Sequence, residues 1–200
     1  MTLVVMERQP EKGSGKMKSS ISQDFIEFAR DHFRLNWDGV HGAAHWARVR
    51  RNGLLLAEHC EADRQVVEWF AFVHDLERRN DFKDPKHGHR AANLAEDLNG
   101  RFMHLSARQL DLLQTACTGH SRGHTKADAT VMVCWDADRL DLGRVGIYPS
   151  AKYLCTKLAR ASDVIEAAYR RSTQNVYESE PSCDWEEAMS CNELGAWESR

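Results

Sequence analysis

The sequence predicts an all-α domain of six or seven helices. Apolar residues recur at intervals of three and four along most of the chain, which is the period of a helix with one buried face. Short polar segments with glycine, proline or asparagine separate these runs. One run, residues 129–135, is β-branched enough to form a strand, but no other segment offers it a partner, so we predict a helix there as well.

Three helices are expected in the first half of the chain. The first starts at Ser22, buries phenylalanines at helical spacing, and ends at the turn-forming segment 36–42. The second covers about 43–60. The third starts after Asp63, a good N-cap residue, and carries a buried apolar run as far as His74.

Four more helices are expected after the polar loop 77–88. They cover about residues 87–98, 106–117, 127–142 and 151–171. A second polar loop, which contains two histidines, separates the fifth helix from the sixth. We therefore expect one domain over residues 21–174, preceded by a disordered tail (1–20) and followed by an acidic tail (175–200).

The composition limits the function. The 200 residues carry a net charge of −3, so no global basic field favours nucleic acid. No apolar run is long enough to span a membrane, and the first residues lack the order of a signal peptide, so we expect a cytoplasmic protein. The six cysteines form no CxxC pair, which favours reduced thiols over a disulfide framework or a zinc ribbon.

Histidine and aspartate recur at the ends of the helices that flank the two polar loops. Helical bundles bind metals through side chains that project inward from facing helices. Imidazole and carboxylate ligands suit manganese, iron, cobalt, nickel or zinc better than calcium. The candidate ligands are His45, His74, Asp75, His87, His120 and Asp138. His74 and Asp75 are neighbours, and the others each lie on a different predicted helix or at its edge.

Simpler interpretations exist for each candidate. The apolar run before the His74–Asp75 pair favours a partner or a metal, because a buried charge needs one. His41 is the alternative metal ligand to His45, and His124 is the alternative to His120. His87 and His120 would otherwise be solvated loop histidines, and Asp138 would otherwise form a plain salt bridge with a neighbouring arginine. Asp136 lies two residues before Asp138, so only one of the two should face a site.

Four segments, taken in order, resemble the HD-domain metal-dependent phosphohydrolases. They are HWARV (45–49), FVHDLE (72–77), HGHRAA (87–92) and DADRLDLGR (136–144). The resemblance covers about residues 22–160. It implies a single HD-domain-like helical bundle, with His45, His74, Asp75 and Asp138 as the common ligands and His87 and His120 as the additional ligands of two-metal members. Only eleven residues separate Asp75 from His87, an interval shorter than in most two-metal members. The sequence is therefore compatible with either one or two bound ions.

The resemblance also implies a function. We expect hydrolysis of a nucleotide or a related small phosphate ester through a metal-activated water. Besides Asp75, the expected catalytic residues are Glu77, as a general acid or base, and Arg144, as a phosphate-binding group. Weaker substrate-binding candidates are Arg79, His124 and Lys152. The alternatives are a dinuclear iron oxygenase of the same superfamily and a metal- or nucleotide-binding regulatory module without turnover. A homo-oligomer is compatible with the sequence.

Overall fold

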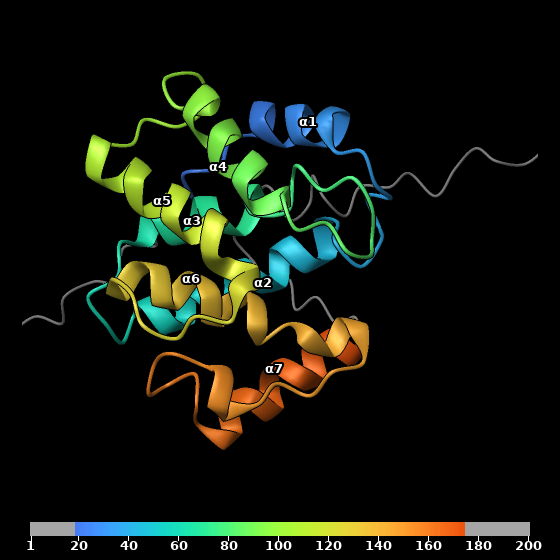
Figure 1. The fold of residues 1–200 in the computed structure, drawn as a ribbon, viewed down its shortest axis with the longest axis vertical. Coiled ribbons are helices and arrows are strands. Elements are labelled where there is room, and N and C mark those ends of the chain that lie inside the picture. The colour runs from blue at the N-terminus through green and yellow to red at the C-terminus, as the bar shows by residue number, and fades with distance from the viewer. Residues whose placement is uncertain (1–18, 175–200) are drawn as a thin grey trace, which may run out of the picture.

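The computed structural model describes residues 19–174, which fold as an all-α domain (Figure 1). The predicted fold class is confirmed: seven α-helices and three short 3₁₀ helices occur in these residues, and no β-strand does. The α-helices are α1 (Gln23–His32), α2 (Ala43–Ala57), α3 (Arg64–Val73), α4 (His87–Leu98), α5 (Ala107–Gly119), α6 (Ala129–Arg139) and α7 (Ser162–Gln174). The 3₁₀ helices are η1 (His120–Arg122), η2 (Leu142–Val145) and η3 (Ala151–Tyr153).

Helix α3 is the centre of the domain. Helices α2, α4, α5 and α6 all contact it, and every residue from Val66 to Val73 is buried. A helix segment that is apolar on nearly all sides must be covered on all sides, and its one buried charged residue, Glu68, is paired with Arg50. The chain leaves this helix at His74 and Asp75, which are therefore delivered into the middle of the bundle, where they are almost completely buried.

Local sequence signals explain where the helices begin. The Asp63 side chain accepts hydrogen bonds from the backbone of Gln65 and Val66, and Ser106 forms a capping box with Gln109. The Asp63 N-cap matches the prediction, and α5 begins directly after Ser106, where the predicted fifth helix started. The β-branched run 129–135 is helical, as predicted, because it packs against α2, α3 and α5 and has no strand beside it.

The predicted helix over 151–171 is wrong in its first half. Residues 151–161 form the short helix η3 and an irregular segment, and α7 begins only at Ser162. The buried Asp136 carboxylate accepts hydrogen bonds from the backbone N–H groups of Cys155 and Thr156, at 2.6 and 2.7 Å. These groups are bound to α6, so they cannot enter a helical hydrogen-bond ladder.

Both chain ends lie largely outside the described residues. The predicted tails therefore stay predictions, since residues 1–18 and 175–200 are not described. Ser19 and Ser20, at the inner edge of the predicted tail, are held against α3, because both hydroxyls donate to the Glu68 carboxylate at 2.8 and 2.7 Å. None of the helices in residues 19–174 has the length and hydrophobicity needed to span a lipid bilayer.

Candidate metal centre

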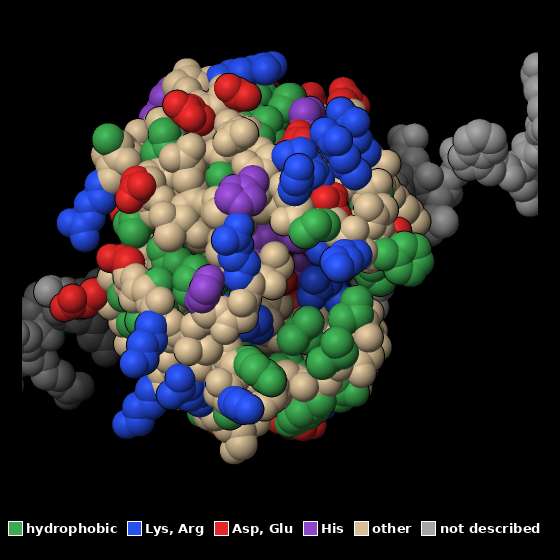
Figure 2. Space-filling model, viewed as in Figure 1, with side chains coloured by type: hydrophobic (Ala, Val, Ile, Leu, Met, Phe, Trp, Pro, Cys, Tyr) green, Lys and Arg blue, Asp and Glu red, His purple; other side chains and the backbone are tan. Residues whose placement is uncertain are grey.

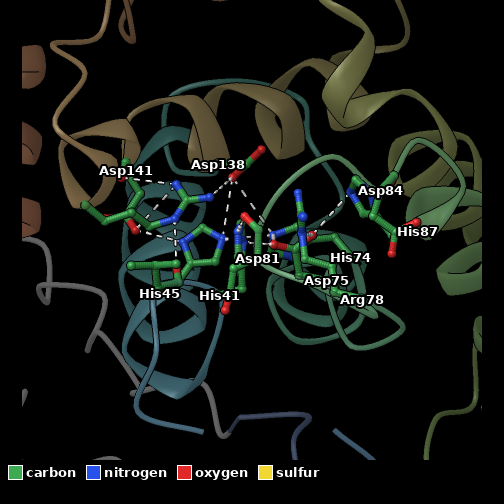
Figure 3. A network of polar contacts seen from close by, with 12 residues as sticks. His41, His45, His74, Asp75, Arg78, Asp81, Asp84, His87, Asp138 and Asp141 are labelled. Atoms are coloured by element: carbon green, nitrogen blue, oxygen red, sulfur yellow. Dashed lines mark hydrogen bonds and ion pairs between the residues drawn. The ribbon is translucent and has the colours of Figure 1, made fainter. Parts of the chain in front are cut away.

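The six predicted ligands come together in two groups, each able to hold a metal ion. The first group is His45, His74 and Asp138, and the second is Asp75, His87 and His120. They come from α2, the turn after α3, the first residue of α4, the start of η1 and the last turn of α6. Figure 3 shows the polar network that joins several of these residues inside the bundle.

The first group has the spacing expected of ligands around one ion. The Nε2 atoms of His45 and His74 are 3.1 Å apart, and Asp138 Oδ1 lies 3.5 and 3.9 Å from them. Ligand atoms about 2.0–2.2 Å from a common ion are separated by roughly 3–3.5 Å from one another. Asp138 is the least buried of the three, so this group lies nearest to solvent.

The second group is equally compact. The Nε2 atoms of His87 and His120 are 2.7 Å apart, and Asp75 Oδ1 lies 3.3 and 3.6 Å from them. The short interval between Asp75 and His87 therefore does not prevent His87 from reaching the other two ligands. Of the two histidines in the second polar loop, His120 joins the group, whereas His124 is exposed and lies against Trp135.

The second ring nitrogen of each histidine fixes its tautomer. Nδ1 faces the Asp141 carboxylate in His45 and a backbone carbonyl in the other three histidines. Since these groups only accept hydrogen bonds, each Nδ1 carries the proton and each neutral ring turns a lone pair on Nε2 toward its group. Two lone pairs that face each other at 3.1 Å or less repel, and a cation between them removes the repulsion.

Burial favours the neutral form of most of these rings. It lowers the pKa of His74 to about 4, and the pKa values of His45 and His87 are also below the ordinary value, mainly because of burial. For His120, burial lowers the pKa, but Asp75, Asp138 and the Cys117 carbonyl together more than offset this and the pKa is raised. Positive charge is therefore favoured at the contact between His120 and Asp75.

The Asp75 carboxylate lies between the two groups. Oδ1 faces the second group, and Oδ2 is 3.8 Å from the Nε2 atoms of both His45 and His74. His41 Nδ1 donates to Oδ2 at 2.8 Å, and Arg78 Nε donates to Oδ1 at 2.9 Å. Burial raises the pKa of Asp75, but the surrounding histidines and Arg78 hold it well below the ordinary value. An ionised carboxylate in this position can bridge two ions.

Asp141 and Arg48 were missing from the predicted site. Asp141 accepts a hydrogen bond from His45 Nδ1 at 2.7 Å and is bound through both oxygens by Arg48, at 2.6 and 3.1 Å. Spacing could have indicated both residues, because Arg48 follows His45 by three positions and Asp141 follows Asp138 by three. Asp136, in contrast, faces away from the groups, as its two-residue offset from Asp138 predicted.

The remaining predicted residues are divided between the site and the surface. Arg144 borders the first group, with its NH2 nitrogen 3.6 Å from Asp138 Oδ1. Glu77 belongs to neither group, because its carboxylate contacts His32 at 2.5 Å and Arg90 at 3.9 Å. The three weaker substrate-binding candidates belong to neither group and are exposed to solvent: Arg79, His124 and Lys152.

Comparison with known proteins supports the fold. No protein-family model and no curated protein matches this sequence. Among solved structures, the chain is similar to the crystal structure of a predicted HD superfamily hydrolase from an uncultured Thermotogales bacterium. The identity is 24%, the TM-score is 0.57, and the match covers 76% of this chain and 86% of the other. The chain therefore has the all-α fold of an HD superfamily protein.

Proposed function

We propose that this protein is a metal-dependent hydrolase of small phosphate esters that works with two divalent transition-metal ions. The observation that carries the proposal is the arrangement of two buried ligand groups with the Asp75 carboxylate between them. The similar structure from the Thermotogales bacterium, described as a predicted hydrolase, supports the same class of reaction.

The charges of the site favour an anionic substrate once ions are bound. Burial holds His45, His74 and His87 mainly in neutral form, and three carboxylates face three guanidinium groups at the ligands. These six charged residues are Asp75, Asp138, Asp141, Arg48, Arg78 and Arg144. Their charges cancel, so each divalent ion adds a net positive charge of two at a site that excludes most water. Such a site attracts phosphate.

The residues of the chain divide the work of the reaction. A bound divalent ion supplies a Lewis acid and lowers the pKa of a water molecule toward neutrality. His45 and His74 present unprotonated Nε2 atoms, and Asp75 holds its two oxygens toward the two groups. Arg144 is anchored by a hydrogen bond from Nε to the Val40 carbonyl at 2.9 Å, so its NH2 end is positioned to bind a phosphate oxygen beside Asp138.

Glu77 has no step in this proposal. Its carboxylate is already paired with His32 and Arg90, and these contacts tie α1 to α4. A general acid or base must lie within hydrogen-bond reach of the proton that it transfers. We therefore assign Glu77 to support of the fold around the site.

The proposal is tested by measuring metal content and turnover together. The purified protein is analysed for bound metal and assayed against a panel of nucleotides and simple phosphate esters with Mn, Fe, Co, Ni or Zn. His74→Ala should lose both bound metal and turnover, whereas His124→Ala, a change at an exposed histidine, should keep both. The proposal is wrong if no metal supports turnover, or if His74→Ala matches the wild type in every assay.

Two other outcomes would identify the alternatives. Oxygen consumption by the iron-loaded protein, without phosphate release, would favour a dinuclear iron oxygenase, which the same ligand arrangement suits. Tight binding of metal and nucleotide without any turnover would favour a regulatory module.

A further inference from the structure

Exposed hydrophobic side chains gather at the mouth of the candidate metal centre. Among residues 19–174, seven large hydrophobic side chains are exposed, and all but Leu55 lie between the α-helices, in the three segments 33–42, 74–86 and 140–161. Four of them, which we call the apolar rim, are Val40, Phe82, Val145 and Ile147. Figure 2 shows histidine, acidic and basic side chains together in a hollow of one face, with hydrophobic side chains along its border.

The three segments are joined to one another by polar contacts at their backbone carbonyls. Arg144 Nε donates to the carbonyl of Val40 at 2.9 Å and so joins η2 to the turn before α2. The His41 ring lies beside the loop after α3, with Nε2 3.4 Å from the carbonyl oxygen of Asp81, so this turn is in contact with that loop. Three rim residues are chain neighbours of the residues in these contacts: Val40 is next to His41, Phe82 is next to Asp81, and Val145 is next to Arg144. These contacts therefore bring the three segments that carry the rim together beside the two ligand groups.

The same contacts lead directly to the proposed ligands. Arg78 donates to Asp75 Oδ1 at 2.9 Å and, through NH1, to the carbonyl of Phe82 at 3.3 Å. Arg144 lies 3.6 Å from Asp138 Oδ1 and immediately precedes Val145. In each ligand group, a carboxylate thus contacts an arginine that is linked to a rim residue. Arg78 bonds to the Phe82 carbonyl, and Arg144 immediately precedes Val145. The exposed fractions, 88% for Phe82 and 53% for Ile147, leave these side chains free to cover a ligand.

We propose that the apolar rim binds an apolar or aromatic group attached to the phosphate of the substrate. This inference rests on the proposed function, because it takes the phosphate to be bound at the ligand groups and Arg144. A substrate with a charged end and an apolar end would fill both zones at once, and burial of its apolar end against Phe82 and Ile147 would favour it over a small polar phosphate.

Two phosphonates that differ only in their organic group test the inference, because a carbon–phosphorus bond is not open to phosphoester hydrolysis. The binding of phenylphosphonate and methylphosphonate to the Mn²⁺-loaded protein is measured by calorimetry. We expect the wild type to bind phenylphosphonate about tenfold more tightly or better, the scale expected for one partly buried aromatic contact. Phe82→Ser and Ile147→Ser should each lose most of this preference and keep their affinity for methylphosphonate.

Leu55→Ser is the matched control. Leu55 is 40% exposed and lies on α2 ten residues after His45, about 15 Å along the helix axis. It should keep the preference for phenylphosphonate. The inference is overturned if the wild type shows no preference, if it binds neither probe, or if both rim variants keep the preference. The inference is also overturned if the rim is a contact between two copies of the chain. In that case the rim variants would change the molecular mass of the protein in solution, from dimer to monomer, and would keep the preference for phenylphosphonate.

Failure of the proposed function would look different. Phenyl phosphate and methyl phosphate would then both resist hydrolysis with every metal, while the phosphonate preference and its loss in the rim variants would persist. The binding measurement therefore decides the role of the rim independently of turnover.

Discussion

Asp141→Asn should weaken metal binding without removing a ligand. In the wild type, the Asp141 carboxylate accepts the Nδ1 proton of His45 at 2.7 Å, which leaves the lone pair on Nε2 directed at the first group. An asparagine that keeps its oxygen on Arg48 turns its NH2 group toward His45. That group can only donate, so it favours the tautomer with the proton on Nε2, the atom that should bind the ion.

The structure allows the size of this effect to be stated. Loss of the partner that orients a metal-binding histidine typically costs about 10–100-fold in metal affinity, or about 1.4–2.8 kcal/mol. A second cost appears in stability, because Arg48 is only 5% exposed and loses its ionised partner. Breaking a buried pair typically costs about 3–5 kcal/mol, so the melting temperature of Asp141→Asn should fall.

Metal affinity is measured by competition with a chromophoric chelator, well below the melting temperature of each variant. Asp136→Asn is the matched control. Asp136 is a fully buried carboxylate on α6, five residues before Asp141, and it binds the backbone of Cys155 and Thr156 and none of the proposed metal ligands. It should lose stability and keep metal affinity. If Asp141→Asn, folded by circular dichroism, binds metal as tightly as the wild type, the tautomer argument is refuted.

Three further predictions concern the second ligand group and the fold. Replacing His120 with alanine should reduce the bound metal from two ions per chain to one by elemental analysis, whereas the same change at His124 should leave two; a single ion in the wild type would contradict the two-group assignment. Gly88→Ala should lower the unfolding free energy by about 1–3 kcal/mol in urea titrations and weaken binding of the second ion, because a Cβ on Gly88 would overlap the carbonyl oxygen of Cys117, which accepts the Nδ1 proton of His120 at 2.7 Å. For Glu68, burial raises the pKa, but Arg50 and Ser20 more than offset this and hold it below the ordinary value, so its contribution to stability is complete above the unfolded pKa of about 4.3 and disappears as the pH falls through the lower folded pKa. The unfolding free energy of Glu68→Gln should therefore depend less steeply on pH below about 4.3 than that of the wild type, and equal slopes would contradict the assignment.

The sequence predicted those parts of the molecule that depend on local pattern. Helical periodicity and N-caps such as Asp63 and Ser106 located the helices, because these signals act within one or two turns. The apolar run at the end of α3, residues 69–73, also indicated that the His74–Asp75 pair would be buried, since an apolar run without a polar face has to be surrounded.

Contacts between distant segments were beyond such patterns. The segment 151–161 reads as helical, but Asp136, about twenty residues earlier, binds its backbone and prevents a helix. The Asp141 carboxylate likewise acts on His45, 96 positions away in the chain. In both cases a buried carboxylate finds its partner through tertiary packing, which no local window of sequence contains.

The short interval between Asp75 and His87 takes on a different meaning in the structure. The loop is braced from both ends: Arg78 donates to the carbonyls of Asn80 and Phe82, and the Asp84 carbonyl accepts the Nδ1 proton of His87. A loop that is cross-linked in this way can be short and still place His87 against His120. The same bracing presents Phe82 to solvent at the edge of the site. The departure from the usual two-metal pattern therefore affects the shape of the loop that presents Phe82 more than the number of ligands.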